Sequence, residues 1–210
     1  MINADTDMNA DVKANVNPPQ AEVRKISYHP FNINAFKTLQ DVCDYLNSST
    51  MIGCHDEIAR DLLNFVLNNL DAFEQSCTFE DIETMFKLLA TKTSIMDVTP
   101  LELCCSTFWT DKATQIKEID LLEKLIDFGK KDARYFELVE YLLTVQAIAN
   151  DSIPIACDLA TLSDFEPRIM KKLPADVQRR LREATFYEEN PDTGRMYCYA
   201  LLTYQLVYVD

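Results

Sequence analysis

Apolar side chains recur every three or four positions along most of this chain, which is the spacing of one buried face on an α-helix. The clearest example runs from Ile58 to Phe73, where acidic and amide side chains fill most of the opposite face. The same spacing predicts helices over residues 35–46, 58–73, 79–90, 99–109, 117–129, 134–150, 154–165 and 174–186. We therefore expect a series of amphipathic helices joined by short loops.

Several helix ends carry recognisable capping residues. Thr78 precedes one helix and is a candidate N-cap, followed by acidic side chains in the first turn. Thr99, Pro100 and Glu102 form a capping-box pattern, in which threonine caps the helix, proline takes the first helical position and glutamate bonds back to the cap. Gly129 is expected to end its helix in the left-handed conformation.

The two ends of the chain differ from the helical middle. Residues 1–22 are rich in Asn, Asp and Ala and are expected to form a disordered tail. Residues 22–29 alternate weakly and fit a short strand or an extended lead-in, and "NPDTG" at 190–194 predicts a turn. The segment 195–209 fits a strand or a helix, and we predict a helix over 196–206 because no turn residues interrupt it.

The predicted fold class is all-α, a bundle or stack of helical hairpins that forms a single domain over residues 23–210, with a short β segment allowed at either end. Only three glycines occur, which argues against β-sandwiches, propellers and phosphate-binding loops. Thr99-Pro100-Leu101 is similar to the start of an ankyrin repeat, but it occurs once, whereas repeat arrays show their signature several times.

The potential metal ligands are not spaced for a structural zinc site. The chain has seven cysteines and two histidines but no C-x-x-C motif. Cys104 and Cys105 are adjacent, so on a helix they point about 100° apart and are unsuited to share one tetrahedral ion. We expect both to be buried core residues. Neither a metal nor any other cofactor is predicted.

The sequence also lacks the common catalytic motifs, including G-x-S-x-G, H-E-x-x-H and the P-loop. We therefore predict no catalytic residues and no enzymatic activity. The remaining enzymatic alternative is Cys-His chemistry, in which His55 would act with Cys43 or Cys54. An odd cysteine count without an apolar leader predicts reduced thiols and a cytoplasmic or nuclear location.

The net charge of −14 disfavours nucleic acid and anionic membranes as partners. One window has the opposite sign, because residues 168–182 hold six positive side chains against the single acid Asp176. This basic segment is our candidate partner-binding site, and the alternative is that its charges pair with acidic side chains of the same chain. Its positive residues are Arg168, Lys171, Lys172, Arg179, Arg180 and Arg182.

Residues 55–109 resemble the BACK domain, the helical module that follows BTB domains in adaptors of Cullin-based ubiquitin ligases. The resemblance rests on apolar spacing in two helices, on a capped third helix and on a tryptophan near its end. The matching residues are Ala59, Leu62, Leu63, Leu67, Leu70, Phe79, Ile82, Leu88, Leu89, Val98, Thr99, Leu103, Cys104 and Trp109. The segment before residue 55 is too short for a BTB domain, so we expect a BACK-like module without that neighbour.

The resemblance implies a non-enzymatic adaptor that binds other proteins, with a Cullin-type ligase or its substrate as partner. The sequence leaves the oligomeric state open. The alternative function is a viral or bacterial host-interaction protein built on a divergent, ankyrin-like helical scaffold.

Overall fold

The computed structural model describes residues 31–48, 56–91, 99–101, 112–146 and 153–209. Its helices in chain order are η1 (Ile33–Ala35), α1 (Leu39–Asn47), α2 (Asp56–Ser76), α3 (Phe79–Thr91), α5 (Lys112–Gly129), α6 (Arg134–Thr144), α7 (Ile155–Leu159), α8 (Phe165–Arg168), η3 (Met170–Lys172) and α9 (Ala175–Glu183). The strands are β1 (Thr185–Asn190), β2 (Arg195–Ala200) and β3 (Leu206–Val209). The mainly helical prediction is confirmed, and the β segment among the described residues lies near the C-terminal end.

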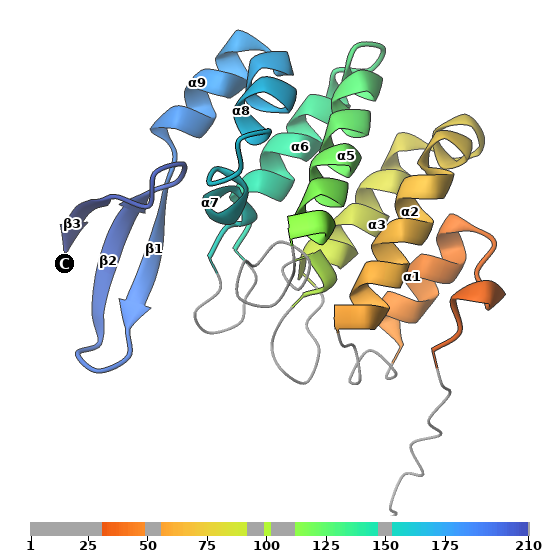
Figure 1. The fold of residues 1–210 in the computed structure, drawn as a ribbon, viewed down its shortest axis with the longest axis horizontal. Coiled ribbons are helices and arrows are strands. Elements are labelled where there is room, and N and C mark those ends of the chain that lie inside the picture. Colours follow the sequence, from red (N-terminus) through yellow and green to blue (C-terminus); the bar gives the residue numbers. More distant parts are fainter. Residues whose placement is uncertain (1–30, 49–55, 92–98, 102–111, 147–152, 210) are drawn as a thin grey trace, which may run out of the picture.

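The longer helices lie side by side in two rows (Figure 1). Helix α3 contacts α1 and α6, and α6 also contacts α9, so these four form one row. Helix α5 contacts α2 and α8, which form the second row. Contacts of α2 with α3 and of α5 with α6 join the rows. Each of these two pairs is an antiparallel hairpin, because a short connection turns the chain back on itself.

The predicted apolar stripes form the core between these rows. Leu62, Val66 and Leu70 on α2 are fully buried, and Phe86 on α3 is buried to the same extent. One continuous cluster of buried residues extends from Leu39 to Leu201, so it reaches from α1 to the C-terminal sheet. The helical spacing in the sequence thus identified most of the buried face in this part of the chain.

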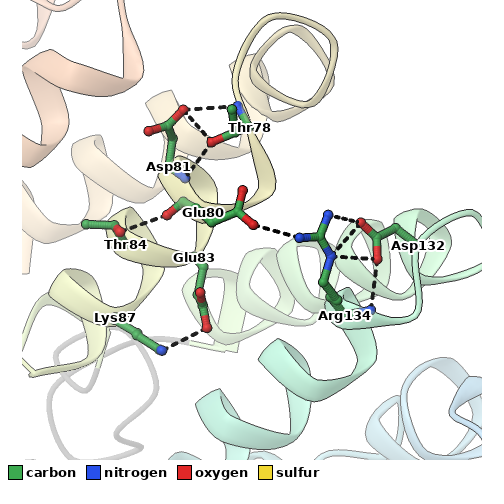
Figure 2. Close-up of polar contacts among 8 residues, drawn as sticks. All are labelled: Thr78, Glu80, Asp81, Glu83, Thr84, Lys87, Asp132 and Arg134. Atoms are coloured by element: carbon green, nitrogen blue, oxygen red, sulfur yellow. Dashed lines mark hydrogen bonds and ion pairs between the residues drawn. The ribbon is translucent and has the colours of Figure 1, made fainter.

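Threonine caps fix where two of the helices begin. The Thr78 hydroxyl accepts the backbone N–H of Asp81 at 3.2 Å, and the Asp81 carboxylate accepts the backbone N–H of Thr78 at 3.0 Å (Figure 2). The N-cap prediction for Thr78 is confirmed. Thr38 forms the same reciprocal capping box with Asp41, so α1 begins at Leu39. The predicted helix start at residue 35 is therefore wrong.

The connection between α5 and α6 is tied to the start of α3. Arg134 donates to Glu80 at 2.7 Å and to Asp132 at 2.7 Å (Figure 2). Its guanidinium also lies over the Phe79 ring, 4.4 Å from the ring centre. The arginine therefore joins the two hairpins through charge and through its contact with an aromatic face.

Gly129 differs from its prediction. It is the last residue of α5, and among the described glycines only Gly194 has a positive φ, so the left-handed stop at Gly129 is wrong. A Cβ at position 129 would lie 2.5 Å from a ring carbon of Phe136. The glycine is therefore needed for the close approach of the Phe136 ring, which α6 places against the end of α5.

Other predicted helices are shorter in the structure or are described only in part. Thr99 is non-helical and Pro100 is helical, as the cap prediction requires, whereas Glu102, Cys104, Cys105 and Trp109 lie outside the described residues. The helix predicted over 154–165 ends at Leu159, and the one predicted over 174–186 runs from Ala175 to Glu183. Residues 1–30, including the predicted tail and lead-in, also lie outside the described part.

The C-terminal segment forms an antiparallel sheet in the order β1-β2-β3, so the helix predicted over 196–206 is wrong. The predicted turn between β1 and β2 is confirmed, with Gly194 at φ 64°. The turn between β2 and β3 has Tyr204 at φ 52°, which is the left-handed region. A large aromatic residue is rare in that region, so no turn was predicted at this position.

Candidate partner-binding surface

The basic segment lies on α8, η3 and α9, where its charges pair largely with acids of the same chain. Arg168 donates to Asp120 at 2.5 Å and to Glu123, both on α5, and Lys172 also pairs with Glu123. The hydrogen bonds from Arg168 lower the pKa of the Glu123 carboxyl, and Lys172 adds to this effect. These contacts hold the α8–η3 region against α5.

Arg180 makes a second tie between elements. Its guanidinium donates twice to Glu140 on α6, at 2.6 and 2.7 Å, and once to Asp176 at 2.9 Å. This fork-like arrangement on Glu140 is the strong geometry for an arginine–carboxylate pair. Arg180 therefore fixes α9 to α6 in addition to carrying surface charge.

The other three positive residues are more exposed. Arg182 pairs with Glu166 at 3.0 Å, and Arg179 pairs with Glu183 within α9 at 3.1 Å. Lys171 is exposed and makes no ion pair with any described residue. The structure thus places the six predicted residues close together and gives five of them internal partners. Partner docking by the basic segment stays a prediction.

The C-terminal sheet carries a different kind of surface. In the described part of the chain, six large hydrophobic side chains are exposed, and every one belongs to the sheet or to its second turn. They are Tyr187, Tyr204, Leu206, Val207, Tyr208 and Val209. Leu206 and Val207 are 52% and 55% exposed. A concentration of apolar side chains at one end of a protein is typical of an interaction site.

The two outer strands of this sheet differ. Strand β1 carries Glu188 and Glu189, and the Gln146 side chain donates to the Tyr187 carbonyl at 2.9 Å. Strand β3 reads Leu-Val-Tyr-Val, is exposed at every position and carries no charge. Charges and side-chain contacts are devices that protect an edge strand from pairing with other chains. The β3 edge, Leu206–Val209, carries no charged side chain, and its contacts include the Tyr208 ring against Tyr187 and a β-bulge in the pairing with β2.

One face of the sheet is lined by stacked aromatic rings. Tyr199 lies between Tyr197 and Tyr204, with ring-centre distances of 6.4 and 4.7 Å and interplanar angles of 18° and 9°. Phe186 stacks on the same Tyr199 ring at 5.6 Å. The Tyr204 hydroxyl donates to Glu188 at 2.7 Å. We call these five residues the tyrosine face.

A hollow of about 180 Å³ opens beside the tyrosine face. Its walls come from β1, the first turn and β2, and we call it the sheet hollow. The residues that line it are Glu188, Glu189, Asn190, Pro191, Tyr197 and Tyr199. Aromatic ring surface and the Glu188 carboxylate therefore meet in this hollow.

The described thiols have the properties of core residues. Burial raises the pKa of Cys43 to about 11 and that of Cys157 to about 12, and the Cys157 thiol donates to the Leu201 carbonyl at 3.1 Å. A thiol with such a pKa supplies little thiolate, the reactive form, near neutral pH. Cys54 and both histidines lie outside the described residues, as do Cys104 and Cys105.

A metal site and a membrane-spanning helix are both absent from the described residues. These residues contain no group of three His, Cys, Asp or Glu side chains arranged to hold a metal ion. None of their helices combines the length and apolar character that crossing a membrane requires.

The tyrosine face was not predicted from the sequence. The alternation in "RMYCYA" at 195–200 is the period-two signal that predicts a strand with its tyrosines on one face, but we predicted a helix over 196–206 instead.

Comparison of the chain with known protein families, with curated proteins and with solved structures gave no match.

Proposed function

We propose that this chain is a non-enzymatic protein-interaction module whose C-terminal sheet binds a partner protein. The observation that carries the proposal is the gathering of the exposed large hydrophobic side chains on this sheet. Each such group loses unfavourable contact with water when a partner covers it, and the uncharged β3 edge offers backbone groups for a further strand. The raised pKa values of Cys43 and Cys157 agree with a non-enzymatic role.

We further propose that the helical part is a stack of hairpins that acts as a BACK-like adaptor, with a Cullin-type ligase or its substrate as partner. The support is the position of the helices along the chain. The first two helices of the resemblance coincide with α2 and α3, and a helix starts at Pro100 directly after Thr99, where the third is expected. In this proposal the helices form the rigid body that presents the sheet.

Site-specific photo-crosslinking tests the sheet as the binding surface. A benzophenone amino acid replaces Tyr208 on β3 in one protein and Glu137, an exposed residue of α6, in a matched control. Both proteins are irradiated in cell extract, and the covalent products are identified by mass spectrometry. We expect a discrete product with a second protein from position 208 and none from position 137.

A charge variant separates the sheet from the basic segment. Lys171→Glu with Arg179→Glu reverses two exposed charges and leaves the ties of Arg168 and Arg180 in place. Crosslinking from position 208 should survive this change. Equal products from positions 208 and 137, or a product with only a second copy of the chain, would contradict the proposal. Loss of the product in the charge variant would instead favour the basic segment as the docking site.

A further inference from the structure

We propose that the sheet hollow receives an arginine side chain from the partner protein. This inference deepens the proposed function and rests on it in taking a protein as the partner. The tyrosine face supplies planar rings and the Glu188 carboxylate, and these are the two kinds of group that bind a guanidinium.

The aromatic part of the site has the geometry for stacking. Tyr197 and Tyr199 line the hollow, and their rings are close to parallel, at 18°. Tyr204 stacks on the far side of Tyr199 at 4.7 Å, which limits the movement of the Tyr199 ring. A guanidinium is flat and weakly hydrated, so it stacks on an aromatic face at less desolvation cost than an ammonium group.

The acidic part of the site is arranged beside those rings. Glu188 pairs across the strands with Tyr197, and its Oε2 accepts the Tyr204 hydroxyl at 2.7 Å, which fixes the carboxylate next to the aromatic rings. Glu189, the next residue of β1, alternates to the opposite face of the sheet, where it pairs across the strands with Met196. The Glu188 carboxylate is therefore the group at the hollow that can accept the N–H groups of a guanidinium.

The acidic hollow between α2 and α5 differs from the sheet hollow, because an arginine of the same chain already pairs with its carboxylates. The α2–α5 hollow is lined by Asp120, Glu123 and Asp127 together with Lys124. Arg168 already pairs with both Asp120 and Glu123. The sheet hollow has no Lys or Arg in its lining, although Arg195 pairs across the strands with Asn190, one of its lining residues.

The overall charge selects the same kind of partner. The chain carries −14, so an acidic segment would be repelled, whereas a basic one is attracted and is then held by the Glu188 carboxylate at the hollow. The hollow also adjoins the exposed apolar strand, because Tyr197 pairs with Val209 and Tyr199 with Leu206. One partner segment can thus cover β3 with apolar residues and place an arginine in the hollow.

The test uses the full chain and two short capped peptides, Val-Thr-Arg-Thr-Val and the same sequence with citrulline in place of arginine. Citrulline keeps the shape of arginine and removes its charge. Binding is followed by ¹⁵N NMR titration at low salt. We expect the arginine peptide to shift the amides of Glu188–Asn190 and Tyr197–Tyr199, and to bind at least about fivefold more tightly than the citrulline peptide.

Variants assign the effect to the hollow. Glu188→Gln and Tyr197→Leu should each weaken binding of the arginine peptide about three- to tenfold, whereas Tyr197→Phe, which keeps the ring, and Glu137→Gln on α6 should leave it unchanged. Equal binding of the two peptides overturns the inference, as do shifts confined to β3. Shifts of the hollow that appear on concentrating the protein without peptide also overturn it, because a second copy then fills the site.

The two proposals fail in different ways. If the citrulline peptide binds as well as the arginine peptide while crosslinking from position 208 still captures a partner, the arginine inference is wrong and the interaction surface stands. If the arginine peptide binds at the hollow but position 208 captures nothing more than position 137, the β3 edge is not the partner surface.

Discussion

The helical rows and the C-terminal sheet use their apolar residues in opposite ways. On α2 and α3 the apolar face is turned inward, and Leu62, Val66 and Phe86 are fully buried. On the sheet, Phe186 is buried in the same continuous core while Leu206 and Val207 are more than half exposed. The hydrophobic residues of the helices therefore stabilise the fold, whereas those on the outer part of the sheet remain available for binding.

The charged side chains show the same contrast. Between α8, α9 and the helices they pack on, arginines and lysines pair with carboxylates of the same chain. At the sheet hollow, Glu188 lies beside aromatic rings, and no Lys or Arg is among the lining residues. A region whose charges and apolar groups are matched internally is a scaffold, whereas a region with both left unmatched is suited to recognition.

The largest effect is expected in the helical core. Phe86→Ala removes a fully buried ring and should lower the free energy of unfolding by about 3–5 kcal/mol, because lost transfer energy and a new cavity add together. Urea denaturation followed by circular dichroism measures the change. If the variant does not fold, Ile82→Val on the same helix should cost about 0.5–1.5 kcal/mol. Wild-type stability in both variants would show that α3 is not central.

A smaller loss is expected where α5 and α6 meet. Gly129→Ala places a Cβ 2.5 Å from the Phe136 ring, and overpacking of this kind costs about 1–3 kcal/mol. This exceeds the gain of about 1 kcal/mol that alanine brings to a helix. The matched background is Phe136→Leu, in which Gly129→Ala should become neutral or stabilising. A thermal melt that shows stabilisation in the wild-type background would refute the close contact.

The ion pairs that hold α8 to α5 predict a pH effect. Hydrogen bonds from Arg168 hold the pKa of the Glu123 carboxyl below its ordinary 4.5. The unfolded chain therefore binds the proton more readily than the folded one, so this contribution to stability is complete above about pH 4.5 and is lost as pH falls through the lower folded pKa.

Glu123→Gln should remove that contribution. At neutral pH we expect a loss of about 1–2 kcal/mol, between the values for exposed and buried pairs. Denaturation at a series of pH values should show that the free energy of unfolding falls less steeply with decreasing pH in the variant than in the wild type. Equal slopes below about pH 4.5 would show that the charge of Glu123 does not stabilise the fold.

The smallest effect on stability is expected at the β3 edge, where binding should change most. Leu206→Thr and Val207→Thr replace exposed residues with a good strand former and should alter the free energy of unfolding by no more than about 0.5 kcal/mol each. Crosslinking from position 208 should nevertheless decrease. A large loss of stability with unchanged crosslinking would reverse the assignment of scaffold and binding surface.

Most of the helical region was predictable because its burial follows the helical period. Ile82, Phe86 and Leu89 lie at such positions on α3, and Thr78 caps that helix in the expected way. Tertiary contacts explain the errors. Gly129 has the sequence appearance of a helix stop, but only the packing of Phe136 shows its role.

The sheet was missed for a local reason. The hairpin between β2 and β3 turns at Tyr204, a residue type that sequence analysis does not associate with a left-handed turn. Because no turn was predicted there, residues 196–206 were predicted to form one continuous helix. The site depends on the same turn, since it brings Tyr204 onto Tyr199 and Glu188. The fold error and the overlooked tyrosine face thus have one cause.

The internal pairing of Arg168, Lys172 and Arg180 also affects how fast a partner arrives. These pairs cancel much of the positive field of the basic segment, so a molecule approaching from solution meets a protein that is negative at long range. Such a field accelerates encounters with cationic surfaces and is screened over about 8 Å at physiological ionic strength. Association rates for a basic partner should therefore fall steeply with added salt, while dissociation is governed by the contacts at the sheet.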